Sequence, residues 1–358
     1  MSREFGNSWV TCSEGFRVAV LIVSFRNPQD VCRCLRALSY STLDPFGIFV
    51  CENGGNESFY NLLEELIAPE APCINITSEE IPNWLVAHSD RLVDIRCLGL
   101  KGSPARVWIG CAAQNLGYAG GINLWINRLR PLKGWKGIWI LNPDSEPEPG
   151  ALEALVKRSI TGRKGMVGST ILPSDNCNYV QCRGGHRWRK LRTNGVTLGF
   201  GEPVNDPVDL AAIEATLDCI SGASMYVSRA CLEEIGPMNE QFFLYYEDAD
   251  WSMRAKGHGL GYARESIVRH TGGTTIGTAR SRAQRSQLSV YLDSRNRLHF
   301  VRMYWRRFLP LAYLLGFLDA AAYLLARSPK NFVAALNGLL AATKGETGAP
   351  RNWQDPIE

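Results

Sequence analysis

Three carboxylates stand at the start of an expected helix, directly after a run of aromatic residues. Glu247, Asp248 and Asp250 follow the segment Phe242-Phe243-Leu244-Tyr245-Tyr246. A carboxylate held against aromatic surface loses water, which is one way in which a general base is tuned. Favourable helix-dipole electrostatics, with Asp250 pairing to Arg254 one turn later, explain the same residues without any chemistry. Both explanations stay open on this segment alone.

Four further segments, each just after an expected strand, are polar or rich in glycine. They are Ser24-Phe25-Arg26-Asn27, Glu52-Asn53-Gly54-Gly55, the run from Asn115 to Asn123, and Asn142-Pro143-Asp144-Ser145. Together they could form a nucleotide pocket, with polar groups for the base and ribose, glycines for close backbone approach and a helix N-terminus for phosphate. Singly, each is also explained as a turn or a cap. His270, at the end of a short strand, is likewise open to a structural or a ligand role.

The elements that must position these residues alternate between short apolar runs and helical patterns. Strands are expected at residues 18–23, 46–51, 106–111 and 137–141, and helices from Asn27-Pro28 onward, at 58–67 and at 122–129. The run 18–23 is continuously apolar, which favours a strand buried on both faces. The alternating order predicts an α/β protein with a mainly parallel, Rossmann-like sheet flanked by helices. Such sheets bind ligands beyond the carboxyl ends of their strands.

The second half of the chain has a different character. Residues 176–206 are rich in Gly, Arg and Asn and suggest a hairpin or a mobile loop. Strands are expected at 221–227 and 267–270, a helix at 247–255, and only helices after Gln287. We therefore expect a first domain over residues 1–280, in two halves at about 17–150 and 151–280, and a helical C-terminal region over residues 281–358.

Composition argues against several classes of protein. The 358 residues carry a formal net charge of +4, which is too mild for a nucleic-acid-binding protein with a dense basic stripe. The eleven cysteines are scattered, without paired CxxC motifs for zinc, and predict a reduced, cytosolic chain. No signal peptide is apparent. A Rossmann oxidoreductase needs a glycine fingerprint after its first strand, and Ser24-Phe25-Arg26-Asn27 lacks one.

The C-terminal region carries arginines followed by a long apolar segment. Eight arginines and a single acid, Asp293, lie between Arg280 and Arg307. Residues 308–326 are mostly apolar and approach the length of a spanning helix, but Asp319 is costly in lipid. We expect an amphipathic helix in the membrane interface, with membrane contact through residues 298–343. A helix packed on the catalytic domain or in a homodimer interface is the alternative.

Taken jointly, these motifs resemble the inverting family 2 glycosyltransferases, in particular their bacterial rhamnosyltransferase-like and galactofuranosyltransferase-like branch. The resemblance covers roughly residues 17 to 305. It rests on Ile22-Val23-Ser24-Phe25, Glu52-Asn53-Gly54, Asn115 to Gly121, Leu141-Asn142-Pro143-Asp144-Ser145, Ser221-Gly222-Ala223, Phe243 to Asp250, His270-Thr271-Gly272-Gly273 and Tyr291-Leu292-Asp293-Ser294-Arg295-Asn296.

The resemblance implies the nucleotide-diphosphosugar transferase fold of the GT-A type, with the donor bound by the first half and the acceptor by the second. The expected reaction moves a rhamnose-like sugar or another hexose from a dTDP- or UDP-sugar to a saccharide or lipid-linked saccharide, in cell-surface polysaccharide synthesis. The anomeric carbon is expected to be inverted. We expect the protein in the cytoplasm, peripheral on the inner face of the cytoplasmic membrane.

The resemblance also implies roles for single residues. Asp144 and His270 match ligands of Mg²⁺ or Mn²⁺. Asp248 matches the general base that deprotonates the acceptor hydroxyl, with Glu247 beside it in the catalytic pair. The remaining matches are expected to bind the donor: Ser24, Asn27, Glu52, Asn53, Asn115, Gly117, Tyr118, Gly121 and Asn142.

Two positions depart from the pattern of the family. Many relatives carry an acid where this chain has Asn142, and an Asp is usual where it has Glu52. The first change removes one negative charge beside the expected metal. A catalytically impaired module that only binds nucleotide-sugars is therefore the alternative function, and Asn142 is its only hint.

Overall fold

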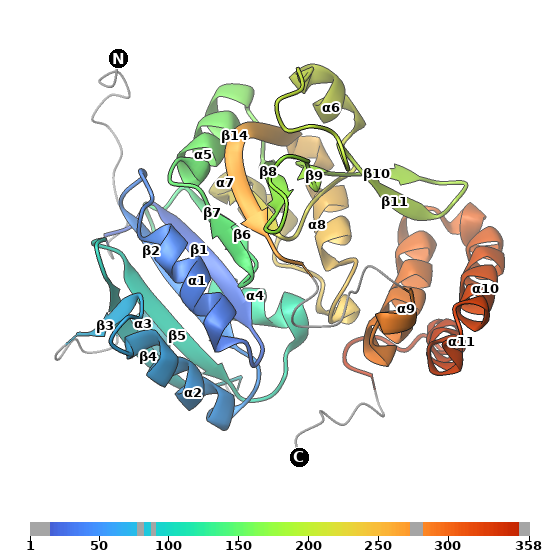
Figure 1. Ribbon diagram of the computed structural model, residues 1–358, viewed down its shortest axis with the longest axis horizontal. Coiled ribbons are helices and arrows are strands. Elements are labelled where there is room, and N and C mark those ends of the chain that lie inside the picture. The colour runs from blue at the N-terminus through green and yellow to red at the C-terminus, as the bar shows by residue number, and fades with distance from the viewer. Residues whose placement is uncertain (1–14, 77–81, 87–90, 273–281, 351–358) are drawn as a thin grey trace.

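A computed structural model of the protein describes residues 15–76, 82–86, 91–272 and 282–350. Within them, a central mixed sheet carries helices on both faces, and three further helices follow at the C-terminal end (Figure 1). The strands of the central sheet are β1 (Val18–Ser24), β2 (Phe46–Glu52), β3 (Cys73–Asn75), β4 (Leu92–Leu100), β5 (Arg106–Ala112), β6 (Gly137–Leu141), β7 (Ser145–Pro147), β8 (Met166–Pro173), β9 (Cys182–Arg183), β13 (Ser224–Ser228) and β14 (Leu260–His270). A small second sheet holds β10 (Gly185–Arg189), β11 (Asn194–Thr197) and β12 (Cys219–Ile220).

The helices fall into two groups. Those that accompany the sheets are α1 (Pro28–Leu38), α2 (Asn56–Ile67), α3 (Asn83–Val86), α4 (Gly117–Leu129), α5 (Ala151–Gly162), α6 (Leu210–Thr216), α7 (Arg229–Ile235) and α8 (Glu247–Ala255). The C-terminal group is α9 (Gln287–Tyr304), α10 (Leu309–Leu325) and α11 (Pro329–Thr343). The predicted domain boundary near residue 280 lies outside the described residues.

Strand directions bring the functional segments to one edge of the sheet. The central strands lie in the order β5-β2-β1-β6 and are parallel to one another. Next to β6, β13 is antiparallel, and β8 and β14 then run parallel to each other and antiparallel to β13. The carboxyl ends of β1, β2, β6, β8 and β14 therefore point the same way, and the residues that precede β13 meet them at that edge.

The core lies on both faces of this sheet, because successive side chains of a strand point to opposite faces. In β1, Ala19, Leu21 and Val23 join the apolar cluster that includes α4 and Trp251 of α8. The alternate residues join the second cluster, which includes α1, α2 and α5. A strand covered twice must be apolar at every position, which is why the continuous run 18–23 correctly predicted a buried strand.

Several boundaries differ from the sequence-based expectation. Helix α4 begins at Gly117 instead of Ile122, and β14 begins at Leu260 instead of Ile267. The expected strand at 221–227 starts three residues later, at Ser224. Residues 176–206 contain the hairpin of β10 and β11. Strand β4 was not expected; it is only partly buried, so its apolar pattern is weak.

The C-terminal helices pack against one another and against the aromatic segment before α8. Helix α10 packs closely on α11, since a Cβ at Gly316 would lie 2.8 Å from Leu339 Cδ2. Pro310 is at the first turn of α10, where its missing N–H costs little, and so it does not interrupt the helix. The stretch Arg306–Leu325 is long and apolar enough to cross a membrane, by length and composition alone, and 22% of its apolar window is buried.

Candidate active site

The register of two antiparallel strands brings Asp144 and His270 together. His270, the last residue of β14, pairs with Ser145, the first residue of β7. Asp144 precedes Ser145, and its Oδ1 lies 3.2 Å from His270 Nε2. The other carboxylate oxygen accepts a hydrogen bond from the Gly272 N–H at 3.0 Å. The two side chains are 11% and 7% exposed for His270 and Asp144, so the pair is fixed before any ligand arrives.

These two side chains fit a divalent cation that also binds phosphate. Mg²⁺ typically takes one or two protein carboxylates and completes its coordination with water and substrate phosphate oxygens. Within the described residues, no cluster of three or more His, Cys, Asp or Glu side chains is arranged to hold a metal. The Gln181 amide lies 3.2 Å from His270 Nδ1 and restrains the ring. We infer that Asp144 and His270 suit a metal shared with a diphosphate and do not form a closed structural site.

Asn142 connects this pair to Tyr118 at the start of α4. The Asn142 Nδ2 lies 3.4 Å from His270 Nε2, and its Oδ1 lies 3.1 Å from the Tyr118 hydroxyl. The same hydroxyl lies 2.9 Å from the Gly222 carbonyl. Burial first, and then the charges of Glu247, Asp248 and Asp144, hold the pKa of this phenol well above its usual range. Tyr118 is therefore a neutral hydrogen-bond donor between the two groups of acids.

Gly222 continues the contacts to Asp248. Its N–H donates to Asp248 Oδ2 at 3.2 Å, and the Ala249 N–H donates to Oδ1 at 2.7 Å. Burial raises the pKa of Asp248, and the nearby His186 of β10 opposes that shift. One continuous chain of polar contacts therefore crosses the carboxyl edge of the sheet. Its members are, in order, Asp144, His270, Asn142, Tyr118, Gly222 and Asp248.

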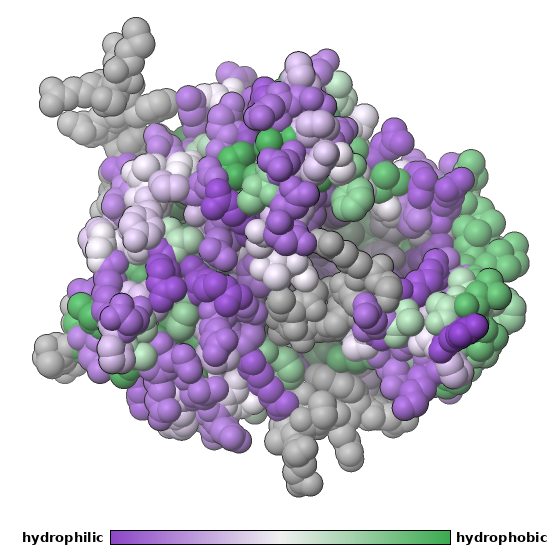
Figure 2. All heavy atoms as spheres, in the orientation of Figure 1, coloured by the Kyte–Doolittle hydropathy of each residue, from purple (hydrophilic) through white to green (hydrophobic). Residues whose placement is uncertain are grey.

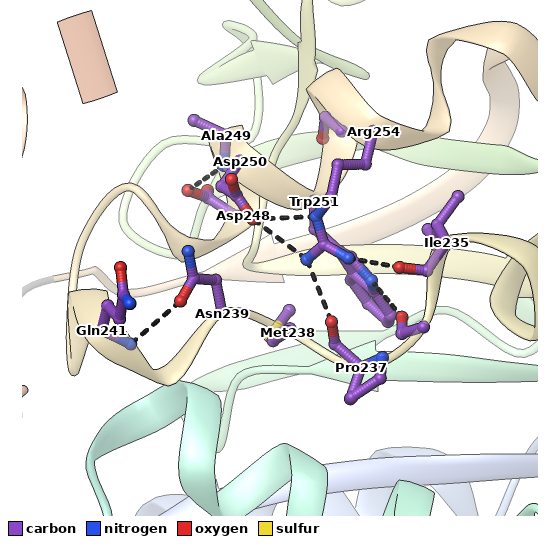
Figure 3. A network of polar contacts seen from close by, with 12 residues as sticks. Ile235, Pro237, Met238, Asn239, Gln241, Asp248, Ala249, Asp250, Trp251 and Arg254 are labelled. Carbon is purple, nitrogen blue, oxygen red and sulfur yellow. Dashed lines mark hydrogen bonds and ion pairs between the residues drawn. The ribbon is translucent and has the colours of Figure 1, made fainter. Parts of the chain in front are cut away.

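The three acids of α8 have different surroundings. Asp250 is buried and accepts from Arg254 at 3.0 Å and from the Tyr304 hydroxyl at 2.7 Å. Figure 3 shows Arg254 reaching from Asp250 to the carbonyls of Ile235 and Pro237. For Asp250 the structural interpretation is therefore confirmed.

Glu247 differs from both of its neighbours. It is 5% exposed, and its Oε2 is buried without a hydrogen-bond partner. Burial and the adjacent Asp248 charge raise the pKa of Glu247 well above its usual range. A buried carboxyl oxygen without a partner is costly in a folded protein. The site thus holds one hydrogen-bonding atom that a bound hydroxyl group could satisfy.

The expected donor-binding residues of β1 and β2 bind one another. Glu52 is fully buried: Ser24 Oγ donates to its Oε2, while the Gly54 N–H and Ser58 Oγ donate to Oε1 at 2.7 and 3.0 Å. Asn27 accepts from Ser24 Oγ at 3.0 Å. Glu52 and Ser24 therefore hold the two strand ends in shape, and a direct contact with the nucleotide stays a prediction for them and for Asn27.

The residues around the start of α4 explain its glycines. Asn53 donates to the Gly117 carbonyl at 2.9 Å, and Asn115 accepts from the Gly117 N–H at 2.9 Å. Gly117 has a φ of 69°, and a Cβ there would lie 2.3 Å from the Phe243 carbonyl oxygen. A Cβ at Gly121 would lie 2.8 Å from Val23. Only glycine allows the helix to approach both the strand and the aromatic segment so closely.

Two residues of the site were not predicted from the sequence. His186 lies near Asp248, and burial lowers its pKa, so it is held towards the neutral form. Asn296 of α9 donates to three carbonyls of the segment that leads into α8. His186 stands in a segment without clear periodicity. Asn296 belongs to the motif Tyr291-Leu292-Asp293-Ser294-Arg295-Asn296, which carried the resemblance but no assigned role.

Comparison with known proteins gives relatives of one kind. No protein-family model matches the chain. The chain is 23% identical over 259 residues to the low-salt glycan biosynthesis hexosyltransferase Agl10 of Haloferax volcanii, which covers 71% of this chain and 75% of that protein. It is 29% identical over 152 residues to the N-acetylglucosaminyl-diphospho-decaprenol L-rhamnosyltransferase of Mycobacterium tuberculosis, covering 38% of this chain and 48% of that protein. The chain thus spans three quarters of the archaeal relative and about half of the mycobacterial one.

The fold agrees with these relatives. The crystal structure of GalNAc-T7 with UDP, GalNAc and Mn²⁺ superposes with a TM-score of 0.52, at 12% identity, over 86% of this chain and 51% of that chain. At such low identity the likeness concerns the fold alone. By this fold and these relatives, the chain is a glycosyltransferase of the GT-A type, related to hexosyl- and rhamnosyltransferases.

Proposed function

We propose that the protein transfers rhamnose or another hexose from a dTDP- or UDP-sugar to a hydroxyl of a glycan or lipid-linked saccharide, with Mg²⁺ or Mn²⁺ and with inversion. The observation that carries this proposal is the polar chain from Asp144 and His270 through Tyr118 to Asp248. It joins a pair of side chains that would suit a divalent cation to a partly exposed carboxylate across one edge of the sheet. A donor diphosphate and an acceptor hydroxyl need those two groups on opposite sides of one sugar.

Each group has a separate task in this mechanism. Asp144 and His270 would hold the cation, which supplies positive charge for the diphosphate leaving group. Asp248 accepts the proton of the attacking acceptor hydroxyl. Asn142 and Tyr118 keep the two ends of the site at a fixed separation. With Asp248 as the one proposed base, the acceptor would attack from the face opposite the diphosphate without a covalent intermediate, and the anomeric carbon would be inverted.

The name of the mycobacterial relative supports a lipid-linked acceptor, because that enzyme is named for a saccharide on diphospho-decaprenol. The name of the archaeal relative, a glycan biosynthesis hexosyltransferase, supports a role in glycan synthesis, and a cell-surface polysaccharide as the product stays a prediction. The described cysteines are all free thiols and mostly buried, which suits a reducing compartment. We propose that the activity takes place in the cytoplasm, at the inner face of the membrane. A homodimer stays a prediction.

The metal is tested by replacing His270 with Ala and titrating Mn²⁺. Donor nucleotide-sugars should raise the unfolding temperature of the full chain only when Mn²⁺ is present. Loss of the imidazole should raise the Mn²⁺ concentration needed for this stabilisation by about 10–100-fold. His258→Ala, which removes an imidazole that faces Glu234 away from the site, is the matched control. Identical titration curves for both variants would return His270 to a structural role.

A membrane-facing surface is formed by the outer sides of α10 and α11. On α10, Leu314, Phe317 and Leu318 are each more than half exposed. Figure 2 shows hydrophobic side chains gathered at this end of the molecule. Exposed cations flank the surface: Arg306 and Arg307 precede α10, Arg327 follows it, and Lys330 is in the first turn of α11. An apolar face bordered by cations fits an anionic lipid surface.

Membrane contact is tested by vesicle flotation of the full chain. Wild type should float with vesicles rich in anionic phospholipid. The double variant Phe317→Glu and Leu318→Glu should stay in the soluble fraction, because two charges then face the lipid. Tyr40→Glu, which adds a charge at an exposed aromatic residue after α1, should float like wild type. Equal flotation of the wild type and the double variant would rule out this surface.

A further inference from the structure

Asn296 holds the backbone of the segment that leads into the proposed base. Its Nδ2 donates to the carbonyls of Phe242, Leu244 and Tyr245 at 2.7, 2.8 and 3.1 Å. The side chain is fully buried. Arg295 Nε donates to Asn296 Oδ1 at 2.9 Å and thereby fixes which end of the amide faces the carbonyls. One side chain of the C-terminal helices thus binds three carbonyls within four residues.

The segment that it holds has an unfavourable backbone. Phe243, Tyr245 and Tyr246 have φ values of 62°, 68° and 74°. Bulky residues rarely adopt this left-handed region, because the Cβ atom meets the backbone, and such residues persist only where their surroundings hold them. Tyr246 is the residue from which α8 starts. The geometry of this segment therefore decides where Asp248, two residues later, is presented.

The other side of the segment is already fixed by the donor half. The Tyr118 N–H donates to the Phe243 carbonyl at 2.7 Å, and Gly117 lies against the same residue. Asn296 supplies the opposing hold from α9. The backbone of residues 242–245 is thus hydrogen-bonded on one side to α4, which carries Tyr118, and on the other side to α9.

We propose that Asn296 is a positioning residue for the transfer reaction, which sets the place of Asp248 by holding the carbonyls of Phe242, Leu244 and Tyr245. This rests on the proposed role of Asp248 as the base. It makes the C-terminal helices part of the catalytic apparatus and gives α9 a function apart from any membrane contact. Asn suits the position because one nitrogen provides two N–H groups, whereas the isosteric Asp would direct an oxygen at three carbonyl oxygens.

The test separates positioning from stability. Asn296→Ala should lower kcat by about 10²-fold, the scale expected from a misplacement of about 1 Å, while donor affinity by calorimetry and its Mn²⁺ dependence stay near wild type. The matched control is Asn331→Ala. Asn331 is also buried in the C-terminal helices, and it donates to the carbonyls of Arg282 and Arg285, away from Asp248. It should lose thermal stability but keep kcat.

A second-site substitution provides a further test of the positioning role. Tyr245→Gly removes the steric cost of a positive φ, so adding it to Asn296→Ala should recover part of the lost kcat although it deletes a large side chain. If Asn296→Ala does not fold, Asn296→Ser decides, since it keeps one donor and should show a smaller fall in kcat. Wild-type kcat in whichever variant folds would overturn the proposal. Asp248→Asn is measured in parallel: if it is impaired while Asn296 variants are fully active, only the positioning role fails, and if it is fully active the base assignment itself fails.

Discussion

Replacement of Asp248 by Asn should slow sugar transfer by about 10²–10⁴-fold, the usual worth of a general base. The amide keeps the shape of the side chain but cannot take a proton, and its single oxygen can accept from only one of the two N–H groups, of Gly222 and Ala249, that now donate to Asp248. Donor affinity and metal dependence should therefore remain close to wild type. The measurement is the transfer rate at saturating donor and acceptor, beside donor affinity by calorimetry.

The role of Asp248 as the base also predicts how the transfer rate changes with pH. Burial raises the pKa of Asp248, and only its ionised form can act as the base. As the pH is lowered, the transfer rate of the wild type should begin to fall at a higher pH than it would with an exposed Asp as the base. The pH–rate profile of Asp248→Asn should lack this acidic decline. Glu247→Gln is the neighbouring control and should act mainly through acceptor position. A fully active Asp248→Asn enzyme beside a dead Glu247→Gln enzyme would move the base by one residue.

Replacement of Asp144 by Ala should abolish transfer and remove the metal-dependent part of donor binding. Asp144 is the one carboxylate beside His270 in the described site, so its loss leaves the cation with a single protein ligand. The diphosphate then lacks its counter-charge. Calorimetric titration of the donor with Mn²⁺ and with EDTA measures this directly, and the two titrations should coincide for the variant.

A control for this substitution lies two residues away. Glu146 is an acid of β7 whose side chain is 43% exposed and lies near Arg33, on a different side from His270. Glu146→Ala should leave transfer and metal dependence unchanged. EDTA-sensitive donor binding in Asp144→Ala, with near-wild-type turnover, would show that Asp144 is not a metal ligand.

Sequence patterns predicted several of the buried elements, although not strand β8, which is equally buried. The fourth strand was predicted at residues 137–141, where it is found, because an interior parallel strand must be apolar throughout. Helix α8 likewise has its predicted bounds, 247–255. The start of α4 was predicted five residues late, since glycines have low helix propensity. The structure shows that close packing on Val23 and Phe243 takes precedence over that propensity.

The arrangement of the site depends on contacts that local patterns do not contain. Asp144 and His270 are 126 positions apart in the chain. The register of β7 against β14 brings Asp144 Oδ1 to within 3.2 Å of His270 Nε2. The sequence supplied the two residue types, and the family resemblance supplied the pairing. The family resemblance placed Glu52 among the donor contacts. In the structure its oxygens accept from Ser24 of β1, the Gly54 N–H and Ser58 of α2, and contact with the nucleotide stays a prediction. Asn296 binds the carbonyl of Phe242, which is 54 residues earlier in the chain, so only the folded structure reveals this contact.

We propose that the protein transfers a sugar from a nucleotide-diphosphate donor in a metal-dependent reaction that inverts the anomeric carbon. The most direct measurement incubates the full chain with dTDP- and UDP-sugars and a lipid-linked N-acetylglucosamine acceptor. It follows nucleoside diphosphate release with Mn²⁺ and with EDTA, and determines the anomeric configuration of the product by NMR. We expect acceptor-dependent release from at least one donor, its loss with EDTA, and an inverted linkage. Release that ignores EDTA, a retained linkage, or no turnover of any donor would contradict it.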